Sequence, residues 1–253
     1  MGRPGVGPFF SIVMPAIESI DLSRRFRRVE AVEGLNLSVP EGSIFGLVGP
    51  NGAGKTTTIK LLMNLVAPTR GSAVVLGTDS RRLAPRDFQR IGYVSENQRL
   101  PGWMTAAELL AYYRPFYPAW DDALCRTLQT DLDLPLNERL RTMSRGMRMK
   151  TALVASLAYR PELVVLDEPF SGLDPFVRDE LIRTLLALGA DNAGPLTMFV
   201  SSHDIGELER LATWIGFIDR GRLTFAEPVS SLLARFSPLS LREIVVKQAR
   251  RTS

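Results

Sequence analysis

A glycine-rich segment, GPNGAGKT at residues 49–56, constrains the fold of this chain more than any other feature. Its glycines let the backbone turn tightly enough for several N–H groups to point at one anion. An apolar stretch of strand type, residues 43–48, precedes the segment, and TTTIKLLMNLV follows it with the spacing of a helix. This strand–loop–helix order predicts a phosphate-binding loop and a helix that continues to about residue 66.

Such a loop predicts a bound nucleoside triphosphate with Mg²⁺. Lys55 would reach the β and γ phosphates, and the Thr56 hydroxyl is an oxygen ligand of the kind that Mg²⁺ prefers. A glycine turn with an incidental lysine is the alternative, and the flanking strand and helix argue against it. We expect these residues to contact the nucleotide: Gly49, Pro50, Asn51, Gly52, Ala53, Gly54, Lys55, Thr56 and Thr57.

Two adjacent acids, Asp167 and Glu168, end a second apolar strand pattern, LVVLDE at 163–168. In a parallel sheet the carboxyl ends of the strands meet at one edge, where ligands bind. We therefore expect Asp167 to hold Mg²⁺ and Glu168 to polarise an attacking water. The alternative is that the acids begin a helix before Pro169, which favours a turn.

Strand and helix patterns alternate along the rest of the chain, which predicts an α/β fold with a mostly parallel sheet. We expect a P-loop NTPase core with a mixed sheet, an N-terminal antiparallel β portion and an inserted helical subdomain at about 97–160. The domain would run from 16 to 236, after a loose extension at 1–15 and before a tail at 237–253 that includes a short helix. The predicted strands are 17–22, 32–39, 43–48, 72–76, 91–94, 163–167, 196–202, 214–219 and 222–226; helices follow at 175–190 and 205–212.

Composition excludes several other classes of protein. The chain is 45% hydrophobic and 23% charged with a net charge of +4, which is typical of a globular domain. No apolar run approaches the ~18 residues that span a bilayer. One histidine and one cysteine exclude an internal disulfide and a zinc cluster, so we expect Cys125 to be a buried or half-buried helix residue.

The chain resembles an ABC transporter ATPase in four motifs that occur in the family's order, over about residues 16–236. They are GPNGAGKT, LVVLDEP, SGLD at 171–174 and SSHD at 201–204. The resemblance implies that Phe26 stacks on adenine and that His203 orients Glu168 or the attacking water. It also implies that Asp174 lies in a loop that crosses to a partner's site. Without the resemblance, Phe26 would be a core residue and Asp174 the N-cap of a helix that starts at Pro175.

Two segments depart from the family pattern. In IGYVSE, Glu96 stands where most members have a glutamine that contacts Mg²⁺; a carboxylate is still an oxygen ligand, and Gln98 is a second candidate. At 144–147 the chain reads SRGM, where the family signature reads SGGQ.

The resemblance implies that this signature faces the γ phosphate bound by a second subunit. Ser144 would cap a helix whose free N–H groups point at that phosphate, and Gly146 is retained. Arg145 would either contact the phosphate or lie in solvent. An SRGM or SKGM signature, with FYPAWD at 116–121, resembles a bacterial subgroup of exporter-type ATPases whose permeases are separate chains.

These features predict a subunit that binds and hydrolyses ATP with Mg²⁺, dimerises on ATP and powers a separate membrane permease, an exporter. The subunit would be cytoplasmic and peripheral on the cytoplasmic face of the cell membrane. The second ATPase subunit could be identical or different. The alternative is a soluble ABC-type ATPase that acts on ribosomes or nucleic acid. No tandem domain, coiled-coil insert or basic tract with interleaved aromatics supports that alternative, so no nucleic-acid partner is expected. A kinase-like enzyme would leave SGLD and SSHD unexplained.

Overall fold

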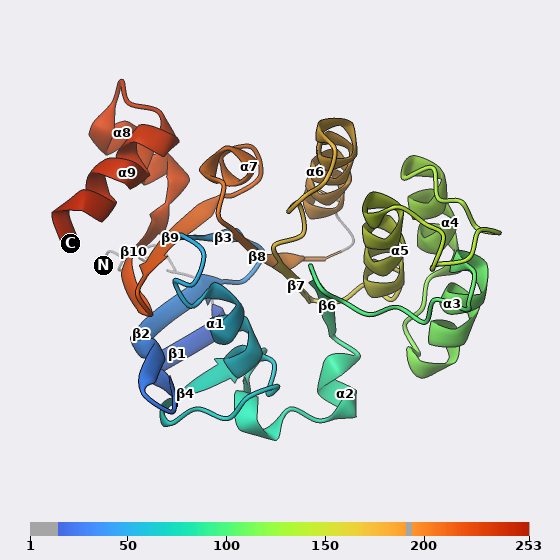
Figure 1. Cartoon of the computed structure of the whole chain (residues 1–253), viewed down its shortest axis with the longest axis horizontal. Helices are drawn as coiled ribbons and strands as arrows, with labels where there is room; N and C mark the ends of the chain where they lie inside the picture. The colour runs from blue at the N-terminus through green and yellow to red at the C-terminus, as the bar shows by residue number, and fades with distance from the viewer. Residues whose placement is uncertain (1–14, 191–193, 253) are drawn as a thin grey trace, which may run out of the picture.

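The computed structural model describes residues 15–190 and 194–252, which form two β-sheets with helices between and around them (Figure 1). The extension predicted for the N-terminus lies, except for residue 15, outside the described residues. Within the described ranges, no helix combines the length and apolar character needed to cross a membrane.

The smaller sheet is antiparallel and has the order β2-β1-β4-β5. Its strands are β1 (Pro15–Phe26), β2 (Val29–Pro40), β4 (Arg70–Val75) and β5 (Thr78–Asp79). This confirms the antiparallel N-terminal portion. The strand continues through Arg24, Arg25 and Phe26, beyond the predicted end at residue 22. The reason is that pairing with β2 persists as far as Phe26 opposite Val29.

The larger sheet has the order β10-β9-β3-β8-β7-β6, and every pair except β10–β9 is parallel. Its strands are β3 (Ile44–Val48), β6 (Ile91–Ser95), β7 (Leu163–Asp167), β8 (Thr197–Ser202), β9 (Trp214–Asp219) and β10 (Arg222–Pro228). The predicted mixed, mostly parallel sheet is confirmed. Its register pairs Val48 with Ser202 and Asp167 with Ser201, so these strand ends reach one edge together.

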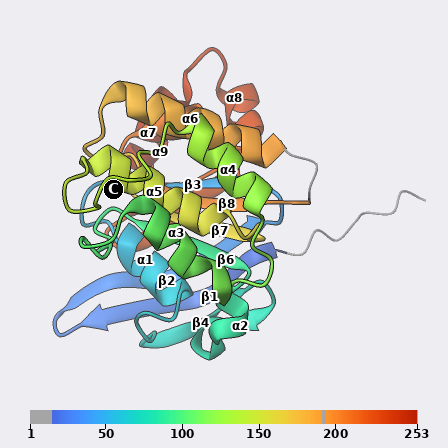
Figure 2. The ribbon, with the colours of Figure 1, turned by 90° about the vertical axis from the view of Figure 1, so that its right-hand side faces the viewer.

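Helix α1 (Lys55–Leu62) lies between the two sheets (Figures 1 and 2). Ile59 and Leu62 are fully buried in one cluster with β1 and β4 residues on one side and Phe45 and Phe199 on the other. The helix ends before residue 66, since Asn64 adopts a left-handed backbone with φ 55°. This packing fixes the N-terminus of α1 at the edge of the larger sheet.

The part of the chain predicted as a helical subdomain holds α3 (Ala106–Tyr113), α4 (Asp122–Asp131) and α5 (Arg145–Leu157), with a short 3₁₀ turn, η2 (Arg114–Phe116), after α3. Thr105, Asp121 and Ser144 cap their N-termini through side-chain oxygens. Cys125 is buried on α4, as expected. A 3₁₀ turn, η1 (Ser80–Arg82), and α2 (Pro85–Phe88) join β5 to β6 and were not predicted.

The remaining helices are α6 (Pro175–Ala190), α7 (Ile205–Glu209), α8 (Val229–Phe236) and α9 (Leu241–Thr252). Helix α7 is shorter than expected, and α8 was not predicted. Helix α9 confirms a helix in the C-terminal segment, and it packs beside α8 (Figure 1). Its Leu241, Ile244 and Val245 are fully buried in the main core cluster, so this segment is part of the packed structure.

Candidate active site

Two glycines of the loop between β3 and α1 lie too close to other backbone for any side chain. A Cβ on Gly49 would lie 2.1 Å from the carbonyl oxygen of Ile218. Gly54 has φ +109°, and its Cβ would lie 2.5 Å from the carbonyl oxygen of Ala31. Glycine at these positions therefore lets the loop wrap closely around the start of α1, where backbone N–H groups are unpaired and attract anions.

Lys55 is held inside this loop, and its side chain is 5% exposed. Its Nζ donates to the carbonyl oxygens of Gly49 at 2.6 Å and Pro50 at 3.1 Å. It also lies 3.1 Å from Oε1 of Glu168. The buried ammonium group of Lys55 is thus fixed between the glycine-rich loop and Glu168.

Thr56 and Asp167 form a pair of oxygen donors beside Lys55. The Thr56 hydroxyl donates to Oδ1 of Asp167 at 3.0 Å, and the Ser201 hydroxyl donates to the same oxygen at 2.9 Å. Burial raises the pKa of Asp167, with hydrogen bonds from Ser201 and Thr56 opposing the shift and the charge of Glu168 adding to it. A hydroxyl beside a carboxylate fits Mg²⁺, which prefers oxygen ligands. In phosphate sites Mg²⁺ takes few of its ligands from the protein and the rest from phosphate oxygens and water.

Glu168 connects Lys55 to His203. Its Oε2 lies 2.8 Å from Nδ1 of His203, and its backbone N–H donates to the Ser201 hydroxyl at 3.0 Å. Its φ of 52° is a left-handed conformation, rare for a residue with a side chain and often found at functional sites. Ser201 was missed by sequence reasoning, although the polar end of TMFVSS was an available signal.

Lys55, Thr56, Glu168 and His203 line one pocket of about 410 Å³, which we call the phosphate-type pocket; its volume is typical of small-molecule sites. Asp167 contacts this pocket through its hydrogen bond with Thr56. The structure thus brings together the predicted loop, the strand-end acids and the histidine. Ala31 and Ser171 also line the pocket and had not been predicted. The lining residues are Ala31, Asn51, Gly52, Gly54, Lys55, Thr56, Thr57, Glu96, Glu168, Ser171 and His203.

Phe26 does not line this pocket. Its side chain is part of the β1–β2 hairpin and is 39% exposed, and the guanidinium carbon of Arg24 lies 4.4 Å from its ring centroid. Ala31 of β2 lines the pocket instead. The adenine contact of Phe26 therefore stays a prediction.

Glu96 lines the pocket but is bound to residues of its own chain. Its Oε1 accepts hydrogen bonds from Arg145 Nη2 at 2.6 Å and from the Ser171 hydroxyl at 2.9 Å. Burial raises the pKa of Glu96, but the hydrogen bonds from Arg145 and Ser171 outweigh it and hold the pKa below its usual value. Gln98 lies in a neighbouring hollow with Arg145 and does not line the phosphate-type pocket.

Ser144, Gly146 and Asp174 lie outside the pocket, at the N-termini of α5 and α6, which we call the α5–α6 edge. The Ser144 hydroxyl accepts from the N–H of Met147 at 3.2 Å, and Oδ1 of Asp174 accepts from the N–H of Phe176 at 2.9 Å. Asp174 is therefore the N-cap that its position before Pro175 had suggested as an alternative. Phe176 is 85% exposed, so this edge presents a large apolar side chain to solvent.

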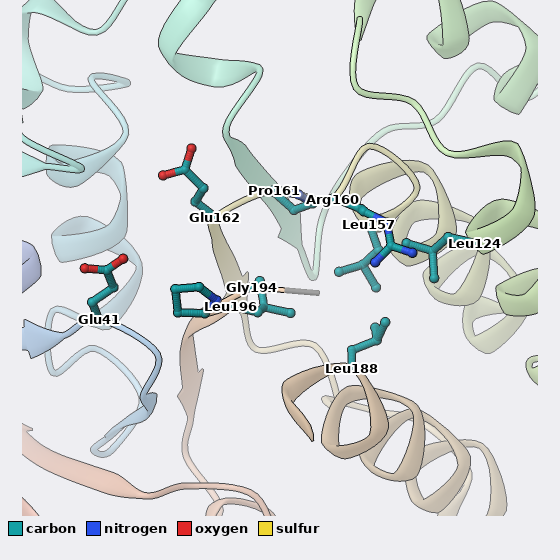
Figure 3. Close-up of a pocket in the computed structure, with 10 residues that line it drawn as sticks. Glu41, Leu124, Leu157, Arg160, Pro161, Glu162, Leu188, Gly194 and Leu196 are labelled. Carbon is teal, nitrogen blue, oxygen red and sulfur yellow. The ribbon is translucent and has the colours of Figure 1, made fainter. Parts of the chain in front are cut away.

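A second hollow of about 280 Å³ lies at the opposite edge of the larger sheet (Figure 3). Leucines from α4, α5 and α6 line it with Arg160, Pro161 and Glu162, which precede β7. Strand β7 runs over five residues from Leu163 to Asp167, so about 13 Å separates its start from Asp167. None of the predicted site residues lines this second hollow.

The sequence profile of the ABC transporter family matches residues 32–171 of the chain. The chain is 33% identical to the bacitracin transport ATP-binding protein BcrA of Bacillus licheniformis, over 87% of this chain and 72% of that protein. It is 34% identical to an uncharacterized ABC transporter ATP-binding protein of Nostoc sp., over 82% of this chain and 62% of that protein. The chain belongs to the ABC transporter family, in its ATP-binding part, as its motifs had predicted.

Solved structures agree with this assignment. A structure of the ATP-binding subunit of an ABC transporter superposes with a TM-score of 0.79 and 27% identity, covering 92% of this chain and 99% of that one. A dimeric ATP-binding cassette bound to ADP and Pi gives a TM-score of 0.75 at 20% identity, which supports the fold.

The chain spans 36% of one curated relative, a probable multidrug ABC transporter ATP-binding protein of Escherichia coli, and 62% of the Nostoc protein.

Proposed function

We propose that this chain binds and hydrolyses Mg·ATP, pairs with a second ATPase subunit and powers a membrane permease formed by separate chains. One observation carries the proposal. Lys55, Thr56, Glu168 and His203 line one pocket at the N-terminus of α1, and Asp167 accepts a hydrogen bond from Thr56 there. This arrangement holds a cation, oxygen donors and a general base within reach of one phosphate chain.

Each group has a chemical role in this proposal. Lys55 and the loop N–H groups neutralise the phosphate charge, and Thr56 and Asp167 offer oxygen ligands to Mg²⁺. Mg²⁺, when bound, supplies further charge neutralisation on the phosphate oxygens. Glu168 accepts a proton from the attacking water, and His203, at 2.8 Å, orients its carboxylate. Because all of these groups come from one chain, it should bind nucleotide as a monomer.

The α5–α6 edge supports a second subunit. Ser144 and Asp174 are exposed and cap helices whose N-termini favour anions, yet neither lines the pocket of their own chain. We propose that this edge covers the γ side of a nucleotide bound by the other subunit. The exposed Phe176 would be buried in that contact.

The names of relatives support an export role. One is a bacitracin transport ATP-binding protein and another, of Cupriavidus pinatubonensis, is named a Nod factor export ATP-binding protein. We therefore propose an exporter permease as the partner and a location at the cytoplasmic face of the membrane. The division into a domain at 16–236 with a helical subdomain at about 97–160, and the SRGM subgroup, are part of the same proposal.

Phosphate release by the purified chain tests the catalytic half of the proposal. The wild type should release phosphate from ATP when Mg²⁺ is present and stop when EDTA removes it. Lys55→Ala is the control, since it removes the cation beside the phosphates and should abolish both nucleotide binding and release. Release that persists unchanged in Lys55→Ala would contradict the assignment of this pocket.

Co-purification in mild detergent from the native host tests the partner. A membrane permease that stays bound supports the proposal. Ribosomes or nucleic acid retained in its place would favour the soluble ATPase considered in the sequence analysis.

A further inference from the structure

Glu96 and Arg145 are the two charged departures from the family pattern, and they contact each other within one chain. Arg145 Nη2 lies 2.6 Å from Oε1 of Glu96. We propose that they form one positioning unit. Arg145 neutralises the charge of Glu96 beside the phosphates of the ATP that the same chain binds, and it acts on the nucleotide through Glu96. This inference rests on the proposed function, since it concerns ATP bound in the same pocket.

The unit joins three separate elements at the edge of the pocket. Glu96 directly follows β6, Arg145 is the first residue of α5, and Ser171 lies in the turn after β7. Ser171 donates to the oxygen of Glu96 that also accepts from Arg145. The backbone N–H of Glu96 donates to the carbonyl oxygen of Asp167 at 2.9 Å. Glu96 is thus tied both to the α5–α6 edge and to the residue that offers Mg²⁺ a carboxylate.

The Arg145 guanidinium lies against the turn that carries Ser171. A Cβ on Gly172, which has φ +65°, would lie 3.1 Å from Nη1 of Arg145. The glycine therefore leaves room for the guanidinium beside Glu96. This contact places the Arg145 guanidinium beside Glu96, which lines the pocket of its own chain.

Charge explains why the two departures belong together. An amide at position 96 needs no counter-ion, but a carboxylate lining the pocket repels the phosphates of ATP. Arg145 offsets that charge, and its side chain is 41% exposed, so part of the effect is screened. Removing the cation alone should harm nucleotide binding, whereas removing both charges should restore it.

A double-mutant cycle tests the unit. We would measure binding of the nonhydrolysable analogue AMPPNP with Mg²⁺ by calorimetry, at dilutions where light scattering shows a monomer. Arg145→Gly should weaken binding by about tenfold, and Glu96→Gln/Arg145→Gly should bind within about threefold of the wild type. Arg145→Lys retains the charge and should also stay within about threefold.

Two controls separate this effect from folding. Thermal unfolding should be alike for all variants, and Arg145→Gln replaces Arg145→Gly if the glycine variant does not fold. Arg210→Gly breaks another partly exposed ion pair, with Asp179, outside the pocket and should leave AMPPNP binding unchanged.

The outcomes distinguish this inference from the proposed function. If the double variant binds as weakly as Arg145→Gly, or Arg145→Gly binds like the wild type, the unit is overturned while the ATPase proposal stands. The first of these results would indicate that Arg145 acts independently of Glu96. A wild type without affinity for AMPPNP would overturn the proposed function and this inference together.

Discussion

The phosphate-type pocket and the α5–α6 edge differ in how completely their polar groups are bound within the chain. In the pocket, Lys55 and Asp167 are buried and held by several partners each. At the edge, Ser144 and Asp174 are exposed and contact the first turns of their own helices. The pocket is preorganised in one chain, whereas the edge is available for contact with another molecule.

This difference separates two steps that depend on different residues. Nucleotide binding and the chemical groups for hydrolysis belong to the pocket, so changes there should act within one subunit. Changes at Ser144 or Asp174 should act only when two subunits meet. The following variants test that separation, from the largest expected effect to the smallest.

Glu168→Gln should have the largest effect on turnover, roughly 10³-fold, because the amide cannot accept the proton of the attacking water. Nucleotide binding should persist, since Lys55 and the loop are unchanged. Phosphate release and ATP titration of the same preparation check both statements. Unchanged turnover would contradict the role of Glu168.

His203→Ala should lower turnover by a smaller factor, roughly 10²-fold, because it orients Glu168 and does not replace it. The 2.8 Å contact between Nδ1 and Oε2 is the physical basis. Steady-state kinetics should show the loss mainly in kcat. If the loss appeared only in KM for ATP, His203 would be a binding residue.

Ser144→Ala should reduce turnover by about tenfold at low protein concentration and leave ATP binding by the monomer unchanged. Thr105→Ala is a matched control, since Thr105 also caps a helix, α3, but lies outside both regions. Both variants lose a helix cap and should lose similar stability, about 1 kcal/mol. Equal turnover in the two variants would remove the special role of the edge.

Glu207→Gln should have the smallest effect. It tests the residue that is hydrogen-bonded to Ser202, the neighbour of His203 in the chain. Glu207 is buried and accepts from the Ser202 hydroxyl at 2.5 Å. Burial raises its pKa, against the hydrogen bond from Ser202. The stability that such a group contributes is complete below its unfolded-state pKa and is lost as the pH rises through its raised folded-state pKa.

The glutamine variant cannot ionise, so it should lose less stability than the wild type between about pH 5 and about pH 8. The difference between the two proteins should therefore grow as the pH rises. Thermal unfolding at both pH values measures it. The same pH dependence in both proteins would show that Glu207 does not titrate in this range.

The sequence predicted the local motifs of the site better than its tertiary contacts, for a physical reason. The loop at 49–56 and the acids at 167 and 168 are local motifs whose neighbours in the chain fix their geometry. The contact between Glu96 and Arg145 joins residues 49 positions apart, and no local pattern reports it. Ser201 reaches Asp167 through sheet pairing, and Ala31 reaches the pocket on the β1–β2 hairpin; both depend on tertiary structure.

In the fold as well, features set by local sequence patterns were predicted and features set by tertiary contacts were missed. Alternating patterns predicted the order and type of most strands and helices, including the parallel sheet. Residues 24–26 were misjudged because cross-strand pairing with β2 outweighs their charged character. Helix α8 was missed, although Leu232 is fully buried in the core, because a short apolar run after a strand carries little periodic signal.

The central claim is that two chains complete one hydrolytic site, and the molar mass of Glu168→Gln in saturating Mg·ATP tests it most directly. Light scattering should give twice the mass of one chain with Mg·ATP and the mass of one chain without nucleotide. A single-chain mass in Mg·ATP, together with wild-type turnover per chain that does not change on dilution, would contradict the claim.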